Sequence, residues 1–192
     1  DVFDPRIIYD PFGGRWIVVA VADRSSASSA VLVAASQTND PTGAWNQYKI
    51  DADSSDVLWA DFPTLGFNKD WIVVQTNMFP ISSGTFATHI RVLTKSQVYA
   101  GSATTPRLLS NTTIGATHQP AVTFDNTLTT EYLLNDWNGN SGGSGFLRLF
   151  TITGAIGSEV LTIGSFVSTA NPWSSGATAT NSAPQSGTAN KI

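Results

Sequence analysis

The chain has 192 residues, a formal net charge of −4 and no cysteine, and it carries 10 Lys and Arg against 14 Asp and Glu. The lack of cysteine excludes a disulfide scaffold, a thiolate zinc site and a cysteine nucleophile, and the charge balance disfavours nucleic-acid binding, which depends on neutralising phosphates. No apolar run approaches the roughly 20 residues of a membrane helix, so membrane insertion is not expected. Charged residues make up only 12% of the chain, while 21 Ser and 23 Thr supply much of its polarity. We interpret this composition as that of an extracellular or cell-surface protein.

Twelve short runs rich in Val, Ile, Thr and aromatic residues follow one another along the chain. Clusters of Gly, Asn, Asp, Ser and Pro separate them, which is typical of strands joined by turns. No window has the 3.6-residue period of a helix, so the sequence predicts an all-β chain without helices. The expected strands are residues 6–9, 16–22, 31–36, 45–50, 65–67, 71–78, 89–94, 108–114, 121–124, 131–135, 146–153 and 160–167.

A repeat runs through these strands. The tetrapeptide Trp-Ile-Val-Val occurs at 16–19 and again at 71–74, and we expect the two copies to occupy equivalent places. A proline opens an apolar run at Pro5, Pro63 and Pro120, and Pro184 is the candidate for a fourth; the spacings are 58, 57 and 64 residues. Each interval holds about four strands, which is the size of a β-propeller blade.

The sequence therefore predicts a β-propeller of about three four-stranded blades with the start of a fourth, within a single domain spanning residues 1–192. Strands that are apolar on both faces favour this fold over a β-sandwich, because both faces of a blade are covered by neighbours. Propellers close with about 4–8 blades, so the remaining blades would come from a longer chain, as in a fragment of a 6–7-bladed propeller, or from a second copy. The expected units are residues 3–58, 61–115, 118–170 and 183–192.

Several segments resemble bacterial secreted β-propellers of the sialidase-like, Asp-box (BNR-repeat) kind. The segment from Ser36 to Trp45 resembles an Asp-box, in which Asp40 would cap a turn and Gly43 would take a positive φ. This resemblance implies a fold staple on the blade rim rather than a catalytic residue. Sialidase activity is not expected, because only Arg6 lies on an innermost strand and the Arg-Ile-Pro signature is absent. The segments that carry the likeness are residues 4–10 with 14–16, 36–45, 61–66, 119–121 and 183–188.

Polar residues at the starts of the innermost strands form the first candidate site. The repeat places Asp4, Asp61 and His118 near the axial mouth, where two carboxylates and an imidazole would bind a cation or act as acid and base in glycoside cleavage. Gln119 and Gln185 are expected at the same mouth as ligand-binding residues. The alternative is that these side chains only cap strand ends.

Two further groups of residues are candidates for binding. Three tryptophans, Trp59, Trp137 and Trp173, are expected in loops beside amides and carboxylates, an arrangement that suits either sugar stacking or latches between blades. The segment with Asp136, Asn138 and Asn140 has oxygen ligands at alternate positions, as a calcium loop has, but it lacks the Gly and Glu of an EF-hand. We expect a flexible hairpin there, with calcium as the one cofactor candidate.

The leading functional hypothesis is a secreted or surface module that binds a glycan or a protein, with no catalysis assignable. One alternative is a glycan-active hydrolase or lyase that uses Asp4, Asp61 and His118. The other is a structural protein that self-assembles through the open ends of its blade arc.

Overall fold

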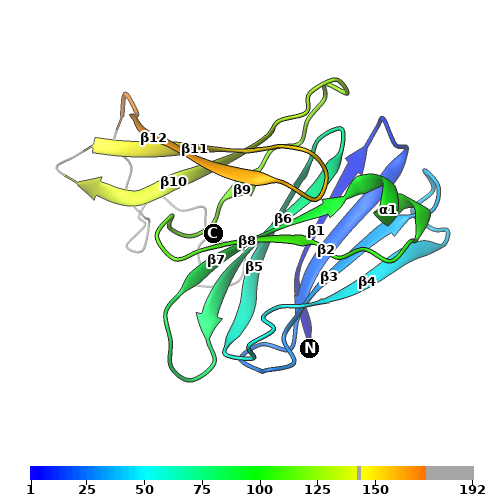
Figure 1. Cartoon of the computed structure of the whole chain (residues 1–192), viewed down its shortest axis with the longest axis horizontal. Helices are drawn as coiled ribbons and strands as arrows, with labels where there is room; N and C mark the ends of the chain where they lie inside the picture. The colour runs from blue at the N-terminus through cyan, green and yellow to red at the C-terminus, as the bar shows by residue number, and fades with distance from the viewer. Residues whose placement is uncertain (142–143, 172–192) are drawn as a thin grey trace, which may run out of the picture.

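The computed structural model describes residues 1–141 and 144–171 (Figure 1). Residues 183–192, expected to begin a fourth unit, lie outside the described residues, as do the expected ligand-binding residues Trp173 and Gln185. The described chain forms three four-stranded antiparallel sheets, which confirms the all-β class. No helix in this part of the chain is long and apolar enough to span a bilayer.

Each sheet takes four consecutive strands in chain order, and the second sheet lies between the first and the third (Figure 1). The first sheet contains β1 (Val2–Asp10), β2 (Arg15–Ala22), β3 (Ala30–Ser36) and β4 (Trp45–Asp51). The second sheet contains β5 (Leu58–Phe67), β6 (Trp71–Pro80), β7 (Ala87–Thr94) and β8 (Arg107–Asn111). The third sheet contains β9 (Gln119–Pro120), β10 (Glu131–Ser141), β11 (Ser144–Thr153) and β12 (Val160–Ser168).

One short helix, α1 (Lys95–Ala100), follows β7, so the expectation of a chain without helices is wrong. The helix ends at Gly101, whose φ of 69° is readily adopted by glycine. The amides of Gly101 and Ser102 donate to the carbonyls of Val98 and Gln97, which satisfies two of its last acceptors. Six residues give too little sequence for a helical period to be visible.

A buried ion pair holds α1 against the first sheet. Lys95 Nζ lies 3.0 Å from Asp10 Oδ2, and the hydroxyl of Tyr99 donates to the same oxygen at 2.7 Å. Asp10 Oδ1 accepts from the amides of Phe12 and Gly13, which closes the turn after β1. Asp10 is fully buried, so these donors replace the water that its carboxylate loses.

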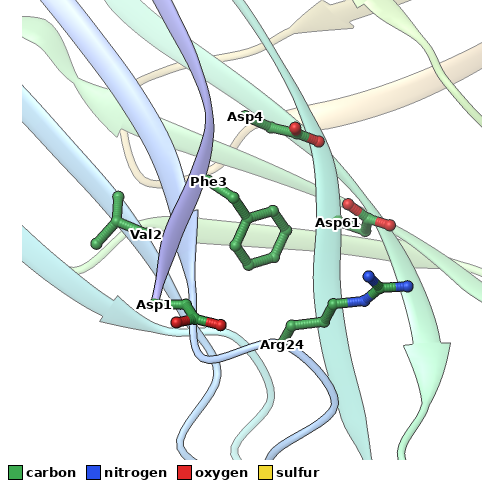
Figure 2. A pocket seen from close by; sticks show the side chains of 6 residues that line it. All are labelled: Asp1, Val2, Phe3, Asp4, Arg24 and Asp61. Carbon is green, nitrogen blue, oxygen red and sulfur yellow. The ribbon is translucent and has the colours of Figure 1, made fainter.

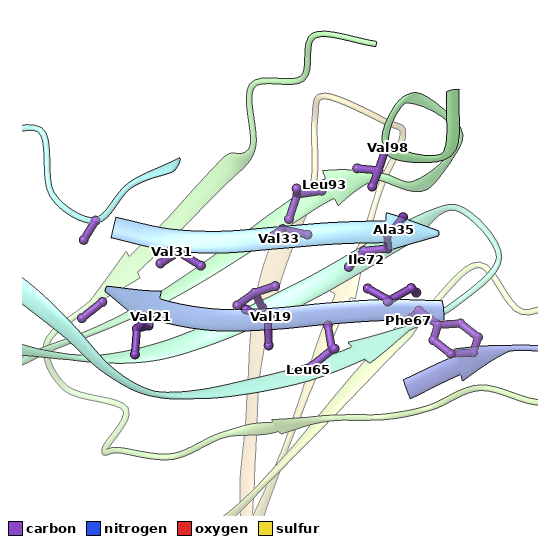
Figure 3. Close-up of a cluster of buried hydrophobic side chains, with 14 of the residues drawn as sticks. Val19, Val21, Val31, Val33, Ala35, Leu65, Phe67, Ile72, Leu93 and Val98 are labelled. Carbon is purple, nitrogen blue, oxygen red and sulfur yellow. The ribbon is translucent and has the colours of Figure 1, made fainter. Parts of the chain in front are cut away.

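The main hydrophobic core lies between the first and second sheets (Figure 3). Alternate residues of β2 and β3 point into it and meet side chains of β5, β6 and β7. This packing explains why Trp-Ile-Val-Val and similar runs are apolar at every position: one set of side chains faces this core and the other faces the opposite side of the sheet. The residues labelled in Figure 3 are Val19, Val21, Val31, Val33, Ala35, Leu65, Phe67, Ile72, Leu93 and Val98.

A smaller core lies between the second and third sheets, where Trp71 and Ile90 pack with Leu133 and Phe150. Glu131 lies two residues before Leu133 on β10, is fully buried, and has no hydrogen-bond partner for either carboxylate oxygen among the described residues. Burial raises the pKa of the Glu131 carboxyl to about 8, and the nearby Ala121 amide and the charge of Lys95 oppose this only in part. The carboxyl is therefore largely protonated at neutral pH.

The first strands of the first and second sheets, β1 and β5, each contain a β-bulge at an equivalent position. In β1 the extra residue falls at Asp4-Pro5, and in β5 at Phe62-Pro63. Asp4 and Phe62 have φ values of 50° and 46°, a conformation that a bulge favours. The spacing of 58 between these two prolines therefore marks structurally equivalent positions.

The two Trp-Ile-Val-Val copies, in contrast, are one position out of register. Arg6 of β1 pairs with Val19, and the equivalent Thr64 of β5 pairs with Gln75, so equivalent residues of β2 and β6 are 56 positions apart. The two copies of the tetrapeptide are 55 positions apart. Ile17 and Ile72 consequently belong to the same core, while Trp16 lies partly exposed on the far side of the first sheet and Trp71 is buried toward the third. The expectation that the two tryptophans are equivalent is wrong; the strands repeat, but this tetrapeptide does not mark their register.

The sheets meet along their first strands. β1 lies against β5, and β5 lies against β9. The amide of Phe67 donates to the carbonyl of Ala121 at 2.9 Å, and the amide of Thr123 donates to that of Phe67 at 3.1 Å, in parallel orientation. This approach requires Gly66, since a Cβ there would lie 2.4 Å from the Ala121 oxygen.

The turn between β3 and β4 has much of the structure that its likeness to an Asp-box predicts. Asp40 Oδ1 accepts from the amide and hydroxyl of Thr42, at 2.9 and 2.7 Å. The indole of Trp45 donates to the carbonyl of Pro41 at 3.0 Å. Gly43 does not take the expected positive φ. All of these contacts lie within residues 40–45, so they stabilise the turn itself.

Candidate functional site

A surface depression of about 570 Å³ lies where β1 approaches β5 (Figure 2). It unites residues from β1, from β5 and from the turn after β2. The residues that line it are Asp1, Val2, Phe3, Asp4, Arg24 and Asp61. Two of the three expected catalytic candidates, Asp4 and Asp61, are therefore brought together.

The shared bulge positions both aspartates. Asp4 is itself a bulge residue, and Asp61 directly precedes the bulge of β5. Asp61 Oδ1 accepts from the amide of Phe62 at 2.8 Å, which leaves its other oxygen outside that bond. Arg6 Nε donates to the carbonyl of Pro63 at 3.4 Å and so ties the two bulges together. The backbone thus holds two carboxylates from different sheets at one place.

The charge of the depression is predominantly negative. Asp1, Asp4 and Asp61 contribute carboxylates, and Arg24 contributes the guanidinium. In Figure 2 the carboxylate of Asp61 lies between that of Asp4 and the Arg24 guanidinium. Among the described residues no ion pair joins Arg24 to any of the three. The carboxylates are therefore available as hydrogen-bond acceptors, and Phe3 supplies an apolar surface beside them.

Trp59 does not line the depression but contacts one of its residues, Arg24. It lies in β5 rather than in a loop, is only 7% exposed, and has the Arg24 guanidinium over its ring at 5.4 Å. Phe79 packs against the same indole with ring centroids 5.5 Å apart. With its ring covered in this way, Trp59 serves to position Arg24 and offers no free face for stacking a sugar.

His118 lies away from the depression. Its side chain is fully buried, with its ring 4.6 Å from that of Phe150, and it is not among the residues that line the depression. Burial lowers the pKa of His118 to about 4, so its imidazole is neutral over the physiological range. Its amide donates to Gln75 Oε1 at 3.0 Å. The structure thus does not unite Asp4, Asp61 and His118 in one site.

The remaining candidates are scattered. Gln119 is exposed, and its amide group donates to the carbonyls of Leu65 and Pro120, so it ties β9 to β5. Asp136 is exposed on β10, in a strand rather than a loop. The side chains of Trp137, Asn138 and Asn140 lie outside the described residues. Within the part that the structure describes, no three His, Cys, Asp or Glu side chains gather as a metal site would require.

Four residues of the depression were not indicated by the sequence: Asp1, Val2, Phe3 and Arg24. Arg24 belongs to the turn between β2 and β3, and only the folding of that turn toward β5 brings it into the depression. The only sequence feature that could have pointed to Arg24 is its position next to the Ser-rich turn at residues 25–29. No family model, curated protein or solved structure matches the chain, so the case for a function rests on this geometry.

Proposed function

We propose that the chain is part of a secreted or cell-surface β-propeller that binds a glycan or a protein in the Asp4–Asp61 depression. Three observations support the propeller arrangement. The sheets are formed in chain order, they pack face to face, and their first strands lie side by side. The likeness to sialidase-like propellers agrees with this arrangement and adds the extracellular setting.

The observation that carries the binding proposal is the convergence of Asp4 and Asp61. Binding sites combine an apolar surface with a few converging polar groups, and here Phe3 lies beside the carboxylates and Arg24. Carboxylates accept hydrogen bonds from sugar hydroxyls or amines and from Lys and Arg side chains. Anionic ligands would be repelled, so neutral or amine-bearing glycans and basic peptide segments are the preferred classes.

Catalysis is not part of the proposal. Acid–base cleavage needs two groups placed on either side of the scissile bond and held in different protonation states. The one histidine offered for such a role, His118, is enclosed between the second and third sheets. The carboxylates of the depression are accordingly assigned to binding.

The test is a screen of the 192-residue chain against neutral and amine-bearing glycans and Lys- or Arg-rich peptides, followed by titration calorimetry of the hits. Asp4→Asn and Asp61→Asn should each weaken binding about tenfold or more, since a hydrogen bond to a charged group contributes about 1.5–3 kcal/mol. Asp56→Asn is the matched control, because Asp56 is exposed and has a φ of 57° that Asn also adopts.

Two results would contradict this proposal. The first is binding that both aspartate variants leave unchanged, or no binding to any member of either class. The second is release of reducing sugar that Asp61→Asn abolishes, which would replace a binding role by a catalytic one.

A further inference from the structure

The two ends of the row of sheets are apolar, and no other sheet of residues 1–141 and 144–171 covers them. We call the side of the first sheet that faces away from the second the leading face; it presents Val18, Ala20, Leu32, Ala34 and Lys49. We call the side of the third sheet that faces away from the second the trailing face; it presents Tyr132, Leu134, Asp136 and Leu149. Tyr132, Leu134 and Leu149 are 36%, 44% and 43% exposed, although their neighbours Leu133 and Phe150 are fully buried.

The interior of the molecule shows how such faces are covered. In both interior contacts, the side of one sheet that faces the next sheet in the chain packs on the side of that next sheet that faces the previous one. This holds for the first and second sheets and for the second and third. Between the three described sheets, no contact joins two faces of the same kind. A leading face is therefore built to receive a trailing face.

The two uncovered faces differ in a way that makes them complementary. The leading face carries small side chains, Ala20 and Ala34, and contains a mainly apolar hollow of about 490 Å³. The trailing face carries the large side chains of Leu134 and Leu149, opposite each other on β10 and β11. If the two faces are brought together, the large side chains of the trailing face fill the hollow over the small side chains of the leading face, as close packing requires.

Charged side chains also distinguish the two faces. Lys49 and Asp51 are both exposed on β4 and point to the side of the leading face, beside Leu32 and Ala30, so this face carries one charge of each sign. Asp136 is exposed on β10 in the trailing face. Two trailing faces brought together would bring two Asp136 carboxylates to the same contact, whereas a leading face offers Lys49. Electrostatics thus favours a leading face against a trailing face over a pair of trailing faces.

We propose that a second copy of this chain docks its trailing face on the leading face of the first. Such a contact is head to tail, and two copies joined this way at both ends form a closed ring of six sheets, within the usual size of a propeller. The inference rests on the propeller arrangement assumed in the proposed function, and it adds the partner that covers the open ends.

The experiment is sedimentation equilibrium of the chain over a concentration series, with one charged substitution on each face. Leu32→Glu blocks the leading face and Leu149→Glu blocks the trailing face; each should weaken association more than tenfold, because a buried unpaired carboxylate is strongly unfavourable. Phe124→Glu is the control, since Phe124 is 74% exposed and lies on neither face. It should associate as the unmodified chain does.

Mixing the two blocked variants separates head-to-tail docking from other contacts. A Leu32→Glu copy keeps its trailing face and a Leu149→Glu copy keeps its leading face, so an equimolar mixture should form dimers although neither variant does alone. A charge exchange, Lys49→Asp with Asp136→Lys, should restore association that Lys49→Asp alone weakens.

A chain that sediments as a monomer at every concentration overturns the proposal, as does association that both Glu variants retain. Self-association of Leu149→Glu alone through leading faces would also overturn it. Glycan or peptide binding is measured separately on Leu149→Glu, whose substitution is remote from the depression, so failure to dimerise and failure to bind remain distinguishable.

Discussion

Replacement of Glu131 by Gln should make the folded chain more stable at pH 8 and leave it nearly unchanged at pH 4.5. The Glu131 carboxyl has an ordinary pKa of 4.5 that burial raises to about 8 in the folded chain. The neutral carboxyl is favoured on folding, so its contribution is fully present below pH 4.5 and is lost as pH rises through 8. At about 1.4 kcal/mol for each tenfold change in proton affinity, the loss reaches up to about 5 kcal/mol.

The assay is urea unfolding followed by tryptophan fluorescence at several values between pH 4.5 and 8.5. Glu131→Gln carries no titrating proton, so the stability difference from the unmodified chain should grow steadily with pH. Leu133→Ala, on the same face of β10 and equally buried, should cost about 2–5 kcal/mol at every pH because it only creates a cavity. A difference between Glu131→Gln and the unmodified chain that does not change with pH would contradict a raised pKa for the Glu131 carboxyl.

Two further substitutions test the packing of α1 and of the first strands. Lys95→Met should destabilise the chain by about 3–5 kcal/mol near neutral pH, because it leaves the buried carboxylate of Asp10 without its cation; adding Asp10→Asn should recover part of this in urea unfolding, and a full additive loss would speak against the ion pair. Gly66→Ala should cost about 1–3 kcal/mol by forcing β5 away from Ala121. Gly43→Ala, whose Cβ would meet only ordinary contacts, should leave the melting temperature nearly unchanged, and equal effects of the two glycine substitutions would contradict the close approach.

The strands and their grouping into four-stranded sheets follow from local sequence. Runs of Val, Ile and Thr between Gly, Asn and Ser turns define them, and apolar residues on both faces of β2 and β6 indicate that each sheet packs on two sides. The helix α1 was missed because six residues show no period. The register of Trp16 and Trp71 was missed because the connection between equivalent residues of β1 and β2 is two residues longer than that between β5 and β6, so an offset of 58 between the first strands becomes 56 between the second strands.

The residues of the candidate site could be predicted only where their place relative to a repeated proline determined their place in the fold. Asp4 directly precedes Pro5 and Asp61 lies two residues before the equivalent Pro63, and both line the same depression. His118 also lies close to a repeated proline, but its amide donates to Gln75 of β6 and its ring is buried against Phe150. Arg24 reaches the depression through the path of a turn, and turn paths are set by tertiary contacts that a single sequence does not display.

Consecutive sheets of the described chain pack face to face, with their first strands side by side. The most direct test is nuclear magnetic resonance of the isotopically labelled chain at the junction of β5 with residues 121–123. We predict a backbone nuclear Overhauser effect between Phe67 and Val122, together with slow hydrogen exchange of the Phe67 and Thr123 amides, which donate across this junction. Fast exchange of both amides and no contact between Phe67 and Val122 would contradict the arrangement.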